Sequence, residues 1–274
     1  MLIRYGFHID LDFGQASTLV TAMDVHPARW GDVVAETRTP YGRPCRARAF
    51  FDAHGNACRR IDLDGGAISL GLVGMIRDVG RPDPVLDLPQ TPVAELPDET
   101  LPYLAASRYC ETDLLGTFAW QHFGAIEGGW ARVQAVCDFV NRHLRFDYAM
   151  ASATRTALGA LEERVGVCRD FTHLAVALCR CLNIPARYCN GYLGDIGVPF
   201  NPDPMDFNAW FEAYLGGSWH VFDARHNQPR IGRILVARGR DAADIPMIHS
   251  FGQHVLRRFE VITEVVPEAL RAVA

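Results

Sequence analysis

The chain has 274 residues, of which 49% are hydrophobic and 22% charged, the balance of a folded globular protein of one or two domains. Its net charge of −5 gives no electrostatic reason to expect nucleic acid or an anionic membrane as a partner. The first residues carry Arg4, Asp10 and Asp12 without an apolar core, so we expect no signal peptide, and no 18-residue apolar run predicts a membrane span.

The eight cysteines form no C-x-x-C pair, and the chain is far longer than a disulfide-stapled mini-domain. We therefore expect reduced thiols and a cytoplasmic location. Most of these cysteines are expected to be small buried apolar residues.

Residues 1–81 predict a β-rich N-terminal domain. The stretch from Leu2 to Phe13 is rich in β-branched and aromatic residues. A turn at 54–56 separates two further candidate strands, and a turn at 64–66 precedes another apolar stretch. Several short strands with turn signals favour a small β-sandwich.

Residues 82–102 hold six of the sixteen prolines of the chain. Proline removes a backbone donor and fixes φ, so neither a helix nor a central strand is expected here. The segment is interpreted either as an extended connector between domains or as an ordered loop wrapped on one of them.

Residues 103–274 predict a second domain with helices first and strands afterwards, including a closing strand at the C-terminal end. Apolar spacing of three and four predicts helices at 101–120, 130–143, 156–164 and 168–182. The predicted strands cover residues 186–193, 209–215, 219–222 and 255–266.

Cys168 follows Gly166 and Val167 and opens the predicted helix at 168–182. A thiol at a helix N-terminus lies near the positive end of the helix dipole and near unpaired backbone donors, which favour the reactive thiolate. The glycine leaves room for a substrate to approach. Cys168 is therefore a candidate nucleophile, and the alternative is an ordinary structural cysteine.

A two-residue turn at Gly216-Gly217 predicts a hairpin in which Asn208 lies opposite Arg225 and Trp210 lies opposite Asp223. Side chains on one face of a strand alternate, so Asn208 and Asp223 become diagonal neighbours about 7–8 Å apart. That separation suits a hydrogen bond between the two side chains. A three-residue turn would put them on opposite faces, so the prediction depends on the register.

Two stretches resemble the catalytic core of bacterial transglutaminase-like proteins. Residues 166–174, Gly-Val-Cys-Arg-Asp-Phe-Thr-His-Leu, are similar to the start of the helix that carries the nucleophile of the family. Residues 206–215 and 219–223, which include Asn-Ala-Trp and Val-Phe-Asp, are similar to its second and third catalytic strands. The resemblance covers about residues 130–230, and residues 1–80 resemble the β-rich region that often precedes this domain in bacteria.

The resemblance implies an α+β fold with a papain-like, transglutaminase-like core, in which a helix bearing the cysteine packs on an antiparallel sheet behind a small β-sandwich domain. It also implies a Cys-His-Asp triad that works on amide or ester bonds without a metal or other cofactor. Cys168 matches the nucleophile and Asp223 the orienting acid. Asn208 stands where the family has histidine, and its amide cannot take a proton from a thiol at neutral pH.

Another histidine could substitute for the missing base, and His226 is the leading candidate because it is close to Asp223 in sequence. In the predicted register it points away from Asp223, an objection that weakens if the strand breaks after residues 222–223. His220 also points to the other face. His173 is rotated by about 140° from Cys168 on the helix and is predicted to be a packing residue.

Trp210 and Arg225 are candidate cleft residues. Trp210 is interpreted as part of a wall for the acyl group or as a core residue. Arg225 is interpreted as a partner of Asp223, as a contact for a substrate carboxylate, or as a solvated residue at the rim. The cysteines of this region fit no zinc spacing, so no metal site is predicted.

The sequence therefore predicts a cysteine-dependent hydrolase or acyl transferase, such as a cysteine protease or amidase, acting on the amide bonds of a peptide or protein substrate. Loss of the triad histidine is expected to impair it, because general acid–base catalysis contributes about 10²–10⁴-fold. The alternative is a catalytically degenerate domain that binds a peptide or protein partner. A homodimer formed through the β-rich domain is a further possibility, and no nucleic-acid or membrane partner is expected.

Overall fold

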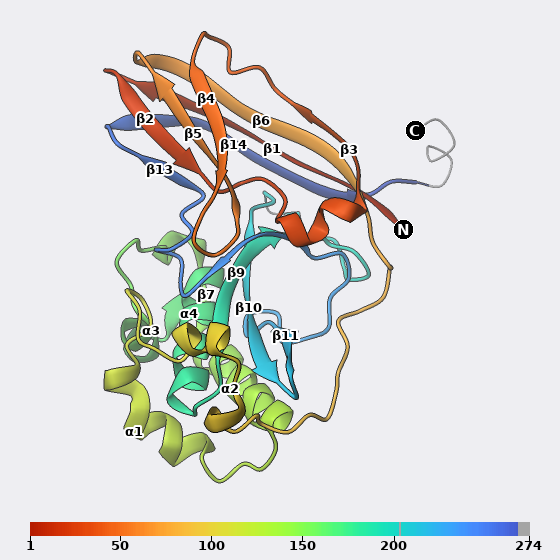
Figure 1. Ribbon diagram of the computed structural model, residues 1–274, viewed down its shortest axis with the longest axis vertical. Coiled ribbons are helices and arrows are strands. Elements are labelled where there is room, and N and C mark those ends of the chain that lie inside the picture. The colour runs from red at the N-terminus through yellow and green to blue at the C-terminus, as the bar shows by residue number, and fades with distance from the viewer. Residues whose placement is uncertain (203, 268–274) are drawn as a thin grey trace.

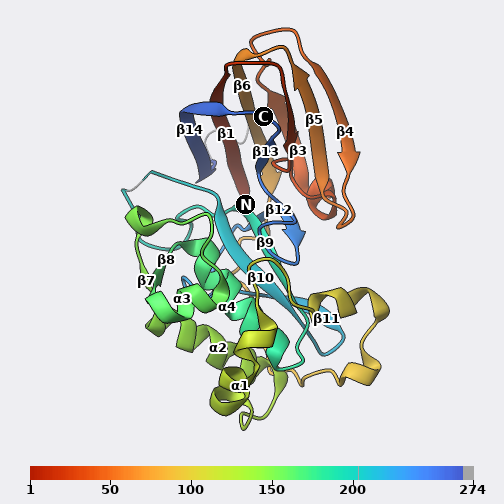
Figure 2. The same ribbon diagram turned by 90° about the vertical axis from the view of Figure 1, so that its left-hand side faces the viewer.

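The structure, a computed structural model, describes residues 1–202 and 204–267. A β-sandwich lies above a mixed layer in which a four-stranded sheet is covered on one face by helices (Figures 1 and 2). This arrangement confirms the predicted α+β class. No helix in the described part of the chain is long and apolar enough to cross a lipid bilayer.

The sandwich consists of two four-stranded antiparallel sheets. One has the order β14-β1-β6-β3, with bounds His254–Val265, Leu2–Phe13, Gly66–Arg77 and Val33–Arg38. The other has the order β13-β2-β5-β4, with bounds Ile248–Ser250, Ser17–Thr21, Ala57–Leu63 and Arg46–Phe51. Strand β1 buries every odd-numbered side chain from Ile3 to Phe13, as expected for a strand with one face in a core.

The prediction that the closing strand belongs to the second domain is wrong. Strand β14 pairs with β1 along almost its whole length, from Ile3 opposite Val265 to Phe13 opposite His254. The sandwich therefore takes strands from both ends of the described chain. Residues 268–274 of the predicted second domain lie outside the described residues.

The mixed layer contains a sheet of order β11-β10-β9-β12, with bounds Ser218–Phe222, Asn208–Leu215, Ala186–Tyr192 and Ile234–Gly239. Four helices accompany it: α1 (Thr112–Phe123), α2 (Gly129–His143), α3 (Ala157–Glu163) and α4 (Cys168–Cys181). Helix α4 is the centre of this layer, and eleven of its residues, from Asp170 to Arg180, are buried. Its predicted apolar stripe packs against α1, α2 and the sheet.

One hydrophobic cluster joins the sandwich to the sheet of the mixed layer, and a second cluster lies between that sheet and the helices. The rings of Tyr5 and Tyr192 lie 5.3 Å apart, and those of Phe7 and Phe207 lie 6.1 Å apart. The sandwich therefore stacks directly on the end of the sheet that carries the candidate site.

The proline-rich segment of residues 82–102, called the connector below, is ordered and wraps the mixed layer, one of its two predicted interpretations. The expectation that it holds no helix is wrong, since two short 3-10 helices, Val93–Glu95 and Asp98–Tyr103, form there. The Leu88 carbonyl accepts hydrogen bonds from the backbone N–H groups of Gly129 and Trp130 at 3.0 and 2.9 Å. The Gln90 side chain donates to the Leu182 carbonyl at 2.9 Å. The segment thus joins the start of α2 to the end of α4.

The contact at Gly129 leaves no room for a side chain, because a Cβ there would lie 2.5 Å from the Gln90 nitrogen. We expect Gly129→Ala to displace the connector and to lower the free energy of unfolding by about 1–3 kcal/mol. Gly116 in α1 has open space around it, so Gly116→Ala is the control and is expected to raise stability by about 0.5–1 kcal/mol. Urea denaturation measures both, and equal effects would contradict the packing argument.

Candidate functional site

Cys168 is the first residue of α4, at the position that the sequence predicts. The helix begins here because the Asp170 carboxylate accepts the Val167 backbone N–H at 2.9 Å, which caps the first turn. Asp170 is itself held by the Arg155 guanidinium at 3.3 Å. The nucleophile candidate therefore stands on a helix end that is fixed by buried polar contacts.

The thiol of Cys168 faces the start of β10. Burial raises its pKa to about 11, and the carboxylates of Asp206 and Asp223 act in the same direction. The Arg225 guanidinium and a hydrogen bond from the Ala209 backbone N–H lower the pKa. The thiol form is therefore favoured at neutral pH unless a base takes the proton.

The predicted hairpin register is confirmed as far as the pair of Phe211 and Phe222, where β11 ends. Leu215 pairs with Ser218, and both turn glycines, Gly216 and Gly217, have positive φ. The predicted strand pairs of Trp210 with Asp223 and of Asn208 with Arg225 do not form in the described ladder. Asn208 instead contacts Arg225 through its side chain, whose Oδ1 atom accepts a hydrogen bond from Arg225 Nη1 at 3.0 Å.

The expected hydrogen bond between Asn208 and Asp223 is not found among the described residues. Asn208 Nδ2 donates instead to the carbonyls of Leu193 and Asp206, at 3.4 and 3.2 Å. Arg225 lies between the two side chains. Its backbone N–H donates to Asp223 Oδ1 and its Nη1 atom donates to Asn208 Oδ1.

Asp223 is buried and accepts four hydrogen bonds. Its Oδ1 atom takes the backbone N–H groups of Arg225 and His226, at 3.0 and 2.9 Å. Its Oδ2 atom contacts His226 Nδ1 at 2.8 Å and Arg233 Nη2 at 2.9 Å. Although burial raises the pKa of this carboxyl, Arg233 and His226 outweigh it and hold the pKa well below the usual range.

His226 reaches Asp223 because β11 ends at Phe222 and the chain turns directly afterwards. The geometric objection to His226 is therefore removed. Since Nδ1 faces the carboxylate, the arrangement favours the tautomer with a proton on Nδ1 and leaves Nε2 as the basic atom. The imidazole lies in an i, i+3 pair with the carboxylate that would orient it.

A small polar hollow of about 70 Å³ lies beside His226, and neither Cys168 nor Asp223 is among its lining residues. Tyr148, Asn208, Arg225 and His226 are among its lining residues. The Arg225 guanidinium is also stacked 3.8 Å above the Phe146 ring, which fixes its direction. Two of the predicted site residues, Asn208 and Arg225, thus share this hollow with His226.

The other candidates lie elsewhere. Trp210 is buried against Cys189 and Leu235 and does not line the polar hollow, so the core interpretation holds for it. His173 is buried, and its Nε2 atom accepts the Ala242 backbone N–H at 3.1 Å, as expected for a packing residue. His220 bonds to Ser218 at 2.9 Å on a strand position away from the site.

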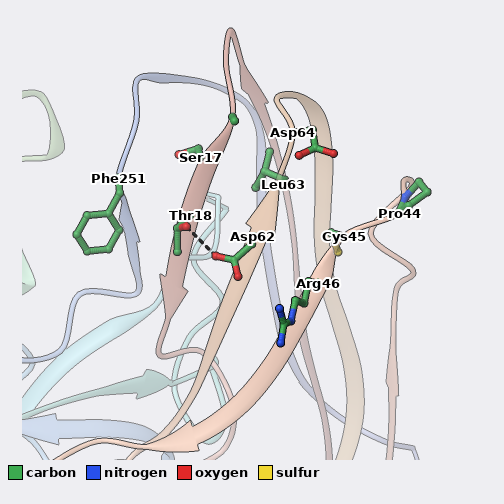
Figure 3. Close-up of a pocket in the computed structure, with 10 residues that line it drawn as sticks. Ser17, Thr18, Pro44, Cys45, Arg46, Asp62, Leu63, Asp64 and Phe251 are labelled. Atoms are coloured by element: carbon green, nitrogen blue, oxygen red, sulfur yellow. Dashed lines mark hydrogen bonds between the residues drawn. The ribbon is translucent and has the colours of Figure 1, made fainter.

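A larger open hollow of about 710 Å³ lies on the sandwich (Figure 3). Thr18 donates to Asp62 at 2.7 Å within it, and Cys45 and Phe251 are among the residues at its border. Its lining contains no histidine, and burial raises the pKa of the Cys45 thiol. The hollow therefore has no counterpart of the contact between His226 and Asp223.

Comparison with known proteins defines the class. Residues 121–224 match the family model of the transglutaminase-like superfamily. The crystal structure of a putative cysteine protease from Cytophaga hutchinsonii covers 96% of this chain and 90% of its own, with a TM-score of 0.83 at 29% identity. The chain therefore contains a transglutaminase-like domain on a papain-like core, with a β-rich region before it.

Curated relatives match a shorter part of the chain. An uncharacterised protein of Mycobacterium leprae is 34% identical over 93 residues, which are 33% of this chain and 33% of that protein. An uncharacterised protein of Mycobacterium tuberculosis is 31% identical over 127 residues, which are 42% of this chain and 40% of that protein. This chain thus aligns with less than half the length of either relative.

The charged groups behind Asp223 are not predicted from the sequence. Arg233 follows Asp223 by ten residues and Asp83 precedes it by 140, so no local pattern relates the three. The spacing of Asp223 and His226 is the one local signal, since three residues suffice for a turn to bring two side chains together.

Asp223→Asn removes the charge that balances buried Arg233, so we expect it to lower the free energy of unfolding by about 3–5 kcal/mol at neutral pH. The native pKa of Asp223 is depressed, so its contribution is present above the unfolded pKa of about 3.9 and is lost as the pH falls below it. The difference between wild type and variant should therefore shrink below about pH 4. Chemical denaturation at several pH values measures it, and a constant difference would contradict the role assigned to this charge.

Proposed function

We propose that the protein is a cysteine-dependent hydrolase or acyl transferase that acts on amide bonds of peptides or proteins, with Cys168 as nucleophile and His226 as base. The observation that carries the proposal is the contact of 2.8 Å between His226 Nδ1 and the buried Asp223 carboxylate, which is close enough to Cys168 to act on the pKa of its thiol. A carboxylate-held imidazole restores the function that Asn208 cannot supply.

In the proposed reaction, His226 Nε2 takes the thiol proton while the Cys168 sulfur attacks the carbonyl carbon. His226 then gives this proton to the nitrogen of the leaving amine, and the tetrahedral intermediate collapses to a thioester as the C–N bond breaks. Water or another amine then attacks the thioester and releases Cys168. Asp223 stabilises the imidazolium that forms in each half of the cycle.

Removal of the base tests the proposal. We expect His226→Gln to lower kcat for hydrolysis of a chromogenic peptide amide by about 10²–10⁴-fold, and Cys168→Ala to abolish turnover. His220→Gln is the matched control, because His220 lies on the adjoining strand away from the hollow. Stopped assays of the purified variants measure the rates, and unchanged hydrolysis by His226→Gln would contradict the assignment of the base.

The alternative is a degenerate domain that binds a peptide or protein in the same hollow without turnover. One observation favours it: burial raises the pKa of the Cys168 thiol to about 11, which keeps the nucleophile protonated at neutral pH. This alternative predicts no hydrolysis by wild type under conditions where a labelled peptide binds.

Asn208→His separates the two proposals. Asp223 Oδ2 is already shared by His226 and Arg233, so a second imidazole at 208 would have to compete for it, and Arg225 loses the Asn208 oxygen that it contacts. We expect kcat to change by less than about tenfold, well below the contribution of a positioned base. A gain of about 10²-fold or more would favour the degenerate domain instead.

A further inference from the structure

The carboxylate that holds His226 is itself held from behind by a buried guanidinium. Arg233 Nη2 donates to Asp223 Oδ2 at 2.9 Å, the same oxygen that faces His226 Nδ1. The Arg233 side chain is 7% exposed and that of Asp223 is 4% exposed, so solvent screens this pair weakly.

Arg233 is tied to the connector by a second carboxylate. Its Nε atom donates to Asp83 Oδ2 at 2.9 Å, and the same oxygen accepts the Arg230 backbone N–H at 3.1 Å. The Asp83 backbone N–H donates in turn to the Arg230 carbonyl at 2.9 Å. The Trp210 ring lies 5.2 Å from the Arg233 guanidinium carbon and limits its movement. Arg233 is thus fixed from several directions.

We propose that Arg233, held by Asp83 of the connector, is a positioning residue that fixes the Asp223 carboxylate as the charged acceptor of the His226 imidazole. The proposal rests on the proposed role of His226 as base. Asp83, Arg233, Asp223 and His226 form a chain of polar contacts from the connector to the hollow. A fixed positive charge behind the carboxylate opposes extra proton binding by the Asp223–His226 pair, so the base stays free at lower pH.

Other charged groups also act on this pair. Those around it come from the turn after β11, the loops that flank β10, the connector, α2, α4 and the short helix before α3. They are Arg225, Arg230, Asp195, Asp206, Asp83, Asp138, Cys137, Cys168 and Tyr148. Arg225 and His226 reach the Asp223 carboxylate through their backbone N–H groups, and His226 also through its imidazole. Arg233 contacts it through a guanidinium, which carries a permanent charge.

The first test follows the proton on His226 itself. We would measure the pH at which the His226 imidazole titrates by NMR, in wild type, Arg233→Met, Arg233→Gln and Arg233→Lys, with the signal assigned from His226→Gln. Loss of the positive charge in the Met and Gln variants should raise that pH by about one unit, the size of effect expected from one nearby charge. The Lys variant keeps a positive charge, so its titration should lie close to that of wild type. Arg59→Met is the control, because Arg59 forms a 2.9 Å pair with Asp24 in the sandwich.

This measurement needs no turnover, so it tests the positioning role even if wild type proves inactive, in which case the proposed function alone fails. Thermal unfolding identifies variants that do not fold. The Arg233→Gln variant keeps a hydrogen-bond donor at position 233. If Arg233→Met does not fold, the His226 titration is compared between wild type and Arg233→Gln. A His226 titration that is the same in wild type and in the folded neutral variant would overturn the proposal.

The second test addresses Asp83. If Asp83 acts through Arg233, Asp83→Asn should lower kcat for the peptide amide by less than Arg233→Met does. The double variant should then lose no more than Arg233→Met alone, since the two side chains form one unit. Arg233→Met itself should lower kcat by about tenfold or more, part of the contribution of a positioned base, and shift the acidic limb of the pH–rate profile upward. Additive losses in the double variant would show that Asp83 has no effect through Arg233.

Discussion

The buried carboxylate of Asp223 constrains the site more than any other group does. A charge in a low-dielectric interior has to be matched by donors, and four of them converge on this one side chain. The backbone donors of residues 225 and 226 close the turn after β11, and the carboxylate also orients the His226 imidazole. Arg233 binds the same carboxylate and links it to Asp83 of the connector. The positions of helix α4 and of the hairpin are local consequences of sequence, but the contacts that join β11 to Arg233 and, through it, to Asp83 depend on this charge.

Helix α4 and the hairpin of β10 and β11 are the parts of the fold that local sequence determines best. The apolar residues from Phe171 to Leu178 favour a buried helix, and the two glycines at 216–217 permit a tight turn with positive φ. The register from Leu215 opposite Ser218 to Phe211 opposite Phe222 then follows from the turn, whereas the contact of residues 208 and 225 lies beyond the end of β11. The same logic cannot assign the closing strand, since a run of alternating residues says nothing about which edge it joins. Short strands such as β2 and β13 carry too few residues to show a period.

The candidate site divides in the same way. The place of Cys168 follows from a helix start, and the pairing of β10 with β11 as far as Phe222 follows from a hairpin. The hydrogen bond expected between Asn208 and Asp223 does not form, because an ionised buried carboxylate prefers an imidazole and a guanidinium to a neutral amide. That competition is decided by Arg233 and by the break in β11 after Phe222, and neither can be read from the spacing of the hairpin residues. The family match ends at residue 224, two residues before His226, so sequence similarity over the domain does not include it either.

Asn208 is a weak base but a good acceptor, and this distinction explains its contacts. Its Oδ1 atom receives Arg225 Nη1 at 3.0 Å, while Phe146 supports the same guanidinium from the other side at 3.8 Å. A protonated imidazole at 208 would repel Arg225, whereas the amide accepts its hydrogen bond without carrying charge. The positive charge that lowers the pKa of the Cys168 thiol in this chain is therefore a permanent guanidinium, not an imidazolium. A guanidinium cannot take up or return a proton near neutral pH, so stabilising a thiolate and removing its proton become tasks of separate residues. Arg225 with Asn208 can serve the first task, and only a titratable group such as His226 can serve the second.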